Sequence, residues 1–143
     1  MKYLVTAIAV ALTVGCATTV ADPEASVFPK TLPFPTVQTM AGDGQPGAVD
    51  GSAARVNRPH GLSYAKEGSL FFADRGNHQV RVLRPDGTVA TVAGTGKAGF
   101  ADGPAKAAQF NEPIAVAVER TGAIYVADRN NHRIRKIKPD GTV

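Results

Sequence analysis

The amino-acid sequence predicts an all-β protein built from repeated four-stranded antiparallel units, and three observations carry this prediction. The first is a repeated phrase, because residues 72–89 and 126–143 share eleven of eighteen residues in register. The second is a constant spacing, since the Ala-Asp pairs that end at Asp74 and Asp128 lie 54 residues apart. The third is the alternation of short apolar runs with turns rich in glycine and proline, which is typical of strands. A period of about 40 to 50 residues with four strands per unit is typical of a β-propeller blade.

Each full unit contains four expected strands joined by tight turns. The expected strands cover residues 61–67, 69–75, 79–84 and 89–94 in the first unit and residues 114–120, 123–129 and 133–138 in the second. The Pro-Asp-Gly sequences at 85–87 and 139–141 favour turns, since proline presets the first turn position, aspartate bonds to local backbone and glycine accepts positive φ. We therefore divide residues 36–143 into a partial blade (36–57, with an outer strand at 36–42), a blade (58–94), a connecting loop (95–112) and an incomplete blade (113–143).

The last residue, Val143, falls where the fourth strand of the second blade should begin. We therefore expect about two blades of a longer, truncated propeller, because unclosed repeat units expose apolar surface and unpaired strand edges. The remaining blades of a longer chain are then the partner of this segment. Closure of the ring by self-association is the alternative.

Residues 1–16 have the features of a signal peptide. A lysine after the start precedes twelve uncharged, mostly apolar residues at 3–14, a run too short for a membrane-spanning helix. The Thr-Val-Gly-Cys sequence that ends at Cys16 resembles the bacterial lipobox, so we expect lipidation of Cys16, the only cysteine of the chain. Cleavage after Ala21 without lipidation is the alternative. The protein is expected to be exported and held by its lipid on a membrane, facing the periplasm or the cell exterior.

Residues 17–35 contain four prolines and are interpreted as an extended tether between this anchor and the repeats. The whole chain carries a formal net charge of +4. The excess of positive charge lies toward the C-terminal end, where residues 120–143 contain six basic and two acidic residues.

The Asn-His sequences at 77–80 and 131–134 resemble the signature of the NHL repeat family, and the stretches at 113–118 and 125–128 fit the same pattern. This resemblance implies a six-bladed propeller of which residues 36–143 are a part. Members of the family commonly serve as binding platforms, and relatives with the same architecture include lactonases and a peptide-amidating lyase. The resemblance implies a platform for a protein or ligand, which the signal-like N-terminus places outside the cytoplasm. A metal-dependent lactonase or lyase that uses the central channel is the alternative.

Two glycine-rich motifs, at 42–47 and 94–99, match the dinucleotide-binding pattern G-x-G-x-x-G. Neither opens a long helix of a βαβ unit, so no cofactor is expected. Asp43, Asp50 and Asp102 lack the dense alternation of oxygen ligands in a calcium loop and are interpreted as turn and cap residues.

The repeated Asp74, Asp128, His78 and His132 are either a ring of ligands or a structural device of each blade. Because a catalytic group is needed once and a turn device in every blade, we interpret the aspartates as caps of the turn that follows them, with the histidine packed across it. His60 is not repeated and is a candidate metal ligand, but a metal site needs three or four converging ligands, so no metal is assigned.

Basic residues on equivalent strands of both blades form a candidate stripe for an anionic ligand. The stripe contains Arg75, Arg81, Arg84, Arg129, Arg133, Arg135, Lys136 and Lys138. A solvated outer face is the alternative. After export the candidate ligands are acidic glycans, lipopolysaccharide or phospholipid headgroups. Nucleic acid is not an expected partner, because nine aromatic residues and no tryptophan do not provide a stacking platform.

Overall fold

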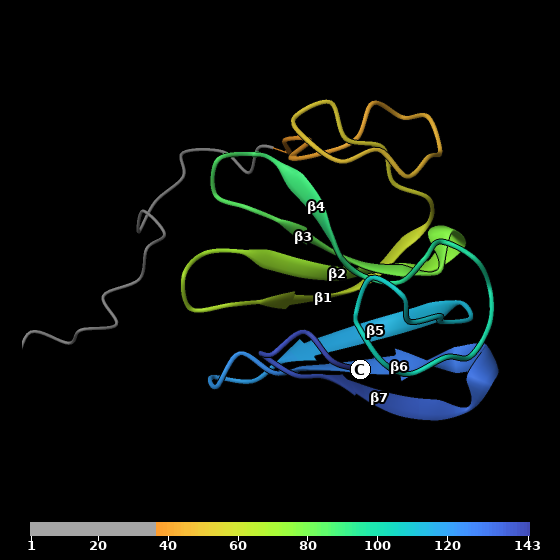
Figure 1. Cartoon of the computed structure of the whole chain (residues 1–143). Helices are drawn as coiled ribbons and strands as arrows, with labels where there is room; N and C mark the ends of the chain where they lie inside the picture. The colour runs from red at the N-terminus through yellow and green to blue at the C-terminus, as the bar shows by residue number, and fades with distance from the viewer. Residues whose placement is uncertain (1–36) are drawn as a thin grey trace, which may run out of the picture. The chain divides into compact units, whose positions relative to one another are not determined.

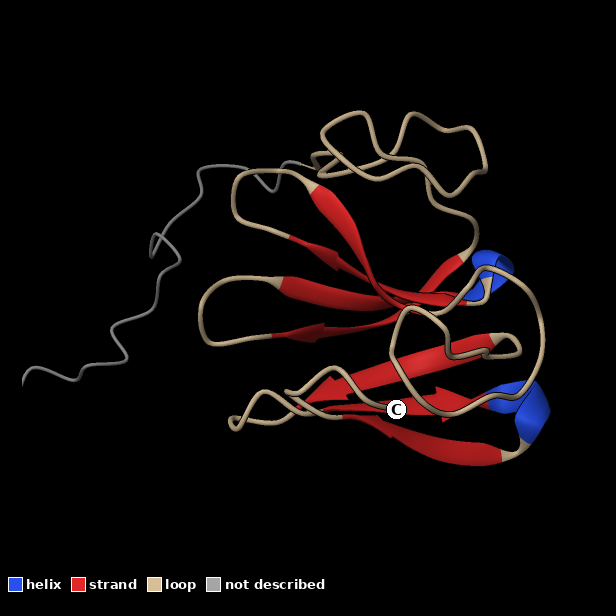
Figure 2. Cartoon of the chain, in the orientation of Figure 1, coloured by secondary structure: helices blue, strands red, loops and turns tan. Residues whose placement is uncertain are grey.

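The structure, a computed structural model, describes residues 37–143 (Figure 1). The expected signal peptide, Cys16 and the proline-rich tether lie outside the described residues. Strands joined by loops make up the described part, with helix only at two short turns (Figure 2). The elements are β1 (Pro59–Tyr64), β2 (Leu70–Asp74), the 3-10 turn η1 (Arg75–Asn77), β3 (Gln79–Leu83), β4 (Val89–Ala93), β5 (Pro113–Val118), β6 (Ile124–Asp128), the 3-10 turn η2 (Arg129–Asn131) and β7 (Arg133–Ile137).

The strands form two antiparallel sheets, one with the order β1-β2-β3-β4 and one with the order β5-β6-β7. The sequence-based fold class is confirmed, because both sheets follow the meander of a propeller blade. No helix within residues 37–143 has the length and apolar character needed to cross a membrane.

The expected outer strand at 36–42 is not present, because the described residues 37–42 form no strand. A strand needs a neighbour that accepts and donates its backbone hydrogen bonds, and no strand within residues 37–143 pairs with this segment. The chain instead contacts the first sheet after this segment, at Gly51, which exchanges two backbone hydrogen bonds of 2.8 and 3.0 Å with Val89.

The Pro-Asp-Gly turns have the expected chemistry. Asp86 accepts hydrogen bonds from the backbone N–H and the hydroxyl of Thr88 at 2.9 and 2.7 Å, and Asp140 does the same for Thr142 at 2.9 and 2.7 Å. These hydrogen bonds lower the pKa of both aspartates. Gly87 adopts a φ of 82°, a conformation that glycine accepts without steric cost.

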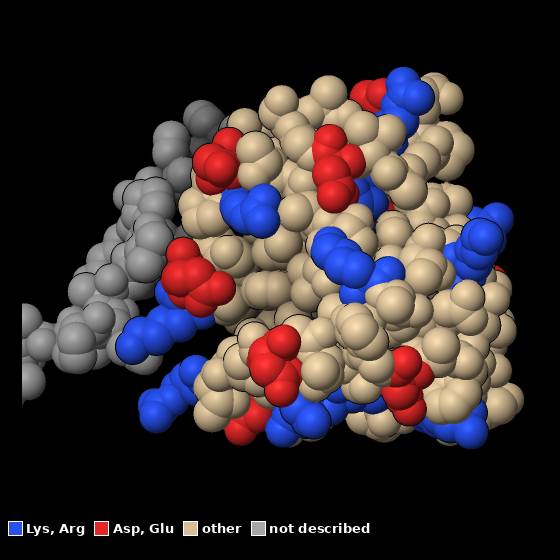
Figure 3. Space-filling view, viewed as in Figure 1, with Lys and Arg blue, Asp and Glu red and all other residues tan. Residues whose placement is uncertain are grey.

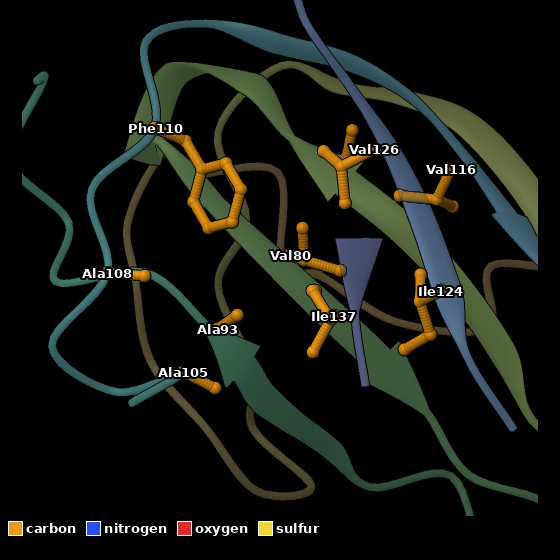
Figure 4. Close-up of a cluster of buried hydrophobic side chains, with 10 residues drawn as sticks. Val80, Ala93, Ala105, Ala108, Phe110, Val116, Ile124, Val126 and Ile137 are labelled. Carbon is orange, nitrogen blue, oxygen red and sulfur yellow. The ribbon is translucent and has the colours of Figure 1, made fainter. Parts of the chain in front are cut away.

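The main core lies between the two sheets (Figure 4). Successive strand residues point to opposite faces of a sheet. We call the face of the first sheet that is directed toward the second sheet its trailing face, and we use the same name for the equivalent face of the second sheet. On the trailing face of the first sheet, Ala73 and Val80 are fully buried against Phe110, Val116 and other side chains of the second unit. Phe110 therefore fills the seam between the units.

The backbones of β1 and β5 approach closely at the seam. A Cβ at Gly61 would overlap the carbonyl oxygen of Ile114. The ring Nδ1 of His60 donates to that oxygen at 2.7 Å, and the hydroxyl of Ser63 accepts from the backbone N–H of Val118 at 3.0 Å. These contacts fix the second sheet against the first.

Candidate functional site

A buried aspartate organises the turn between the second and third strands of the first sheet. Asp74 has no exposed surface. Its Oδ1 accepts the backbone N–H of Asn57 at 2.8 Å. Its Oδ2 accepts the Nδ2–H of Asn77 at 2.8 Å and the Nη1–H of Arg81 at 2.7 Å. A buried carboxylate of this kind is stable because a cation and hydrogen-bond donors surround it.

The second sheet repeats this network residue by residue. Asp128 is equally buried, and its Oδ1 accepts the backbone N–H of Asn111 at 2.8 Å. Its Oδ2 accepts from Asn131 at 2.8 Å and from Arg135 at 3.0 Å. The repeated aspartate, asparagine and arginine of the sequence are therefore one structural unit in each blade.

Each buried arginine also binds the loop that precedes its sheet, which we call the entry loop of that blade. The Nη2 of Arg81 donates to the carbonyl oxygen of Val49 at 2.8 Å and to Asp50 at 2.7 Å. The Nη2 of Arg135 donates to the carbonyl oxygen of Ala101 at 2.7 Å and to Asp102 at 2.5 Å. The entry loop and the turn of each blade are thus held in one geometry.

The expected basic stripe is wrong for Arg81 and Arg135, which are buried and neutralised by carboxylates. An arginine taken out of water must be paired, because an isolated buried charge is strongly destabilising. The expectation that Asp74 caps the backbone N–H groups of its own turn is also wrong, since its carboxylate makes no capping bond there and binds the side chain of Asn77 and the backbone N–H of Asn57. The expectation that these aspartates are structural agrees with the network.

The remaining basic residues do not form one continuous stripe. Arg133 lies over the ring of Phe100 at 4.1 Å, whereas Lys136 lies over Tyr125 at 5.1 Å on the trailing face of the second sheet. The exposed Arg84 and Lys138 belong to turns at another end of the sheets. On the face shown in Figure 3, acidic and basic side chains are interspersed.

Two arginines of the predicted stripe do come together, at the end of the sheets where β1 and β5 begin and where both 3-10 turns lie (Figure 1). A single carboxylate joins them, because Glu112 accepts from Arg75 at 2.7 Å and from Arg129 at 3.4 Å. We call this surface the arginine end. It consists of residues 57–60, 75–78, 111–114 and 129–132, which hold Arg58, Arg75 and Arg129 against the single acid Glu112.

Glu112 is ionised at neutral pH. The hydrogen bond from Arg75 and the charges of Arg75 and Arg129 outweigh the effect of burial, so that the pKa of Glu112 lies below its ordinary value of 4.5. Even with this carboxylate ionised, the arginine end keeps an excess of positive charge. Arg58 is exposed and forms no ion pair within residues 37–143.

The three histidines of the chain lie at this end and do not converge on a metal. His60 bonds to the Ile114 carbonyl oxygen, and the Nδ1 of His78 accepts the backbone N–H of Glu112 at 3.1 Å. His132, the counterpart of His78, is exposed. Residues 37–143 contain no group of three or more His, Cys, Asp or Glu side chains arranged to hold a metal ion.

His78 and His132 end the two 3-10 turns with left-handed backbone, with φ of 54° and 53°. This conformation is uncommon for residues other than glycine. It turns the chain back into the third strand of each sheet and fixes the position of the preceding arginine.

Comparison with known proteins agrees with this architecture. The family described as NHL repeat matches residues 56–83 and 110–137, which cover the first three strands of each sheet. The chain is 44% identical over 94 residues to SUPPRESSOR OF QUENCHING 1, chloroplastic, of Arabidopsis thaliana, a match that covers 64% of this chain and 9% of that protein. It is 39% identical over 95 residues to NHL repeat-containing protein 2 of Gallus gallus, covering 62% of this chain and 13% of that protein.

Solved structures show the same fold. An auxiliary nutrient binding protein from Bacteroides thetaiotaomicron VPI-5482 superposes with a TM-score of 0.64 at 33% identity, over 68% of this chain and 27% of that chain. One from Bacteroides ovatus ATCC 8483 superposes with a TM-score of 0.59 at 36% identity, over 64% of this chain and 26% of that chain. The chain spans 9% and 13% of the length of the two curated relatives. It belongs to the NHL repeat proteins and contains two repeats in the described residues.

Sequence reasoning missed Arg58 and Glu112 as members of the site. Both occupy the same position of the repeat, two residues after a conspicuous apolar residue and just before a proline, and both have positive φ (53° and 50°). The sequence signal that could have revealed both residues is a reversal of charge, because Arg58 and Glu112 occupy the same position of two otherwise similar loops.

Proposed function

We propose that this chain is an extracytoplasmic binding platform that uses the arginine end to hold a ligand bearing carboxylate or phosphate groups. The observation that carries the proposal is the exposure of Arg58 and Arg129 at one end of the sheets, where the single acid Glu112 forms no ion pair with Arg58 and only a long one, of 3.4 Å, with Arg129. Guanidinium groups bind carboxylate and phosphate through paired N–H donors.

Preorganisation supports the proposal. The backbone N–H of Gly76 donates to Asn57 at 2.8 Å, and that of Asn130 donates to Asn111 at 3.0 Å, so each arginine-bearing turn is tied to its entry loop. The buried pairs of Asp74 with Arg81 and of Asp128 with Arg135 also stabilise these turns. A binding surface that is already ordered loses little conformational entropy when the ligand arrives.

Two further observations support a binding role outside the cytoplasm. The two similar Bacteroides structures are named auxiliary nutrient binding proteins. Residues 1–16 of this chain have the features of a signal peptide. The alternative, a metal-dependent lactonase or lyase, gains no support from His60, because this histidine bonds to a backbone oxygen at the seam.

The proposal is tested by binding of anionic polymers to the full chain at low and high salt. Polygalacturonate serves as the carboxylate probe, inorganic polyphosphate as the phosphate probe and dextran as the uncharged control. We expect Arg58→Ala combined with Arg129→Ala to weaken binding of an anionic probe by about tenfold at low salt, and much less at high salt, because screening shortens the reach of exposed charges.

The matched control is Lys66→Ala combined with Arg84→Ala, which removes two exposed charges from turns outside the arginine end. Equal weakening by the two double variants would show a general effect of net charge and contradict the proposal. Absence of binding to both anionic probes at low salt would also contradict it.

A further inference from the structure

The contact of Glu112 with two arginines uses only a small part of their hydrogen-bonding capacity. The Nε–H of Arg75, at 3.2 Å, and its Nη2–H, at 2.7 Å, both donate to the same oxygen, Oε2 of Glu112. The Nη1–H of Arg129 donates to that oxygen as well, at 3.4 Å. Within residues 37–143 no group donates to the other oxygen, Oε1. One oxygen atom therefore serves two guanidinium groups, each of which carries several N–H donors.

This geometry favours an anion with more oxygens than a carboxylate. The parallel N–H groups of an arginine bind best to two oxygens of one anion. A phosphate monoester has three terminal oxygens and nearly two negative charges. It can offer two oxygens to Arg75 and the third to Arg129. A carboxylate ligand only replaces Glu112 by its like, and a phosphodiester has one terminal oxygen and one charge fewer.

The Glu112 carboxylate can turn away without loss of its loop. Its backbone N–H donates to the Nδ1 of His78 at 3.1 Å, a contact that does not involve the carboxylate. The first unit has Arg58 at the equivalent position, with a φ of 53° against 50° for Glu112. The loop conformation therefore forms without an acid, and among the described residues the acid occurs in the second unit alone.

Glu112 competes with any anion for this position as long as it is ionised. Its pKa is lowered, chiefly by the hydrogen bond from Arg75, so it carries its charge at neutral pH. Its hold on Arg129 is weak, because the contact is long and the Arg129 side chain is 52% exposed. Exposed ion pairs of this kind contribute little, so that an external anion can replace them.

We propose that Arg75 and Arg129 form a subsite for the terminal phosphate of a phosphate monoester, and that Glu112 is an internal anion that occupies this subsite until the ligand displaces it. The inference rests on the proposed function, which it narrows from carboxylate or phosphate to phosphate. Glu112 then sets the specificity, because a ligand must bind the arginines better than a carboxylate does.

The test compares three small probes on the full chain. Phenyl phosphate is the monoester, methyl phenyl phosphate the diester and benzoate the carboxylate, and all three carry the same ring. Dissociation constants are measured by NMR titration at about pH 8, where the monoester carries both charges. The variant is Glu112→Gln and its matched control is Glu67→Gln, which alters an exposed glutamate outside the arginine end.

We expect the wild-type chain to bind phenyl phosphate about tenfold more tightly than either other probe, because only the monoester supplies two charges and three oxygens. Glu112→Gln should strengthen binding of phenyl phosphate by about fivefold, since a like charge is removed from the subsite. Glu67→Gln should leave it unchanged. If Glu112→Gln does not fold, Arg129→Gln replaces it and should weaken binding by about tenfold.

A second arm identifies the source of the phosphate. Sedimentation with phosphatidylcholine vesicles is compared with and without phosphatidate, a lipid whose headgroup is a phosphate monoester. Binding that depends on both phosphatidate and Arg129 would assign the subsite to a lipid headgroup. Binding of phenyl phosphate without binding to these vesicles would assign it to a soluble phosphorylated ligand. Both results support the subsite.

Three outcomes would overturn the inference. Equal affinity for phenyl phosphate and benzoate would show that the subsite does not select phosphate. An unchanged affinity in Glu112→Gln, or the same gain in Glu67→Gln, would show that Glu112 is no competitor. If these results arose while the anionic polymers still bound through Arg58 and Arg129, the subsite would be rejected and the proposed function would stand.

Discussion

The Arg81 guanidinium is stable in the interior because oxygen atoms bind both of its terminal nitrogens. Asp74 neutralises it from its own sheet, while the Val49 carbonyl oxygen and Asp50 bind its other nitrogen. Burial raises the pKa of Asp50, but the hydrogen bonds from Thr91 and the charge and hydrogen bond of Arg81 outweigh it, so the pKa is lowered overall. Asp50 and Asp74 therefore share this one cation.

Removal of the Asp74 carboxylate should strongly destabilise the folded state. We expect Asp74→Ala to lower the free energy of unfolding by about 3–5 kcal/mol, since it leaves a buried guanidinium without its closest partner. Asp50→Ala should cost less, because the Asp50 side chain is 50% exposed and Asp74 remains in place. Urea denaturation followed by circular dichroism measures both losses.

The control for this prediction is Glu67→Ala, an exposed residue of the turn after β1, which should change stability by no more than about 0.5 kcal/mol. If Asp74→Ala destabilised the chain no more than Glu67→Ala does, the network would not be a structural element.

Residue patterns predict the strand that contains Arg81 but not its environment. The alternation of Arg81 with Val80 and Val82 is the same pattern that a solvated strand face shows. The partner Asp50 lies 31 residues earlier in a loop without secondary structure, so its proximity depends on tertiary folding. The sequence shows that Asp74 and Arg81 recur as Asp128 and Arg135. It does not show that each aspartate binds the arginine of its own repeat.

Among the elements, the loop that precedes the second sheet carries the ion pairs of the seam. Glu112 joins Arg75 of the first unit to Arg129 of the second. Its pKa is lowered, chiefly by the hydrogen bond from Arg75. Its contribution to stability is therefore present at pH values above the ordinary 4.5 and is lost as the pH falls through the lower pKa of the folded state.

The lowered pKa of Glu112 predicts that the effect of Glu112→Gln on stability depends on pH. We expect the variant to be less stable than the wild-type chain at about pH 7 and to approach it in stability as the pH falls through the lowered pKa of the wild-type carboxyl, where that carboxyl becomes protonated. The midpoint of urea unfolding measures the difference at each pH.

Glu67→Gln, which alters an exposed glutamate without an ion pair among residues 37–143, is the matched control and should show no such convergence. A constant difference between Glu112→Gln and the wild-type chain from neutral to acidic pH would contradict the assignment.

Strand positions were largely predictable because their turns have specific chemistry. The Pro-Asp-Gly turns and the repeated phrase place β2, β3, β6 and β7 within a few residues. Residues 37–42 were assigned a strand from their likeness to 88–94, but a strand also requires a partner, which local sequence does not reveal. The arginine end was only half predictable, since Arg75 and Arg129 belonged to the stripe, whereas Arg58 was not assigned to it and Glu112 reaches Arg75 only through tertiary folding.

On the scale of the whole molecule, the sequence predicts attachment to a membrane through Cys16, which lies outside the described residues. The lipobox-like sequence predicts that Cys16→Ser leaves the protein without its lipid and moves it from the membrane to the soluble extracytoplasmic fraction, because stable anchoring requires acyl chains. Fractionation of cells followed by immunoblotting measures the shift. Equal membrane association of the variant and the wild-type chain would show that lipidation of Cys16 is not the anchor.

The buried networks also define where one unit ends and the next begins. The polar partners of the first network lie between Gly47 and Thr91, and those of the second lie between Gly99 and Arg135. A duplication or deletion with its breakpoints at these glycines would carry a complete network with it and leave none divided. Such a chain can change its number of repeats by recombination, and only the seam residues, such as Arg58 and Glu112, then need to be matched to the new neighbour.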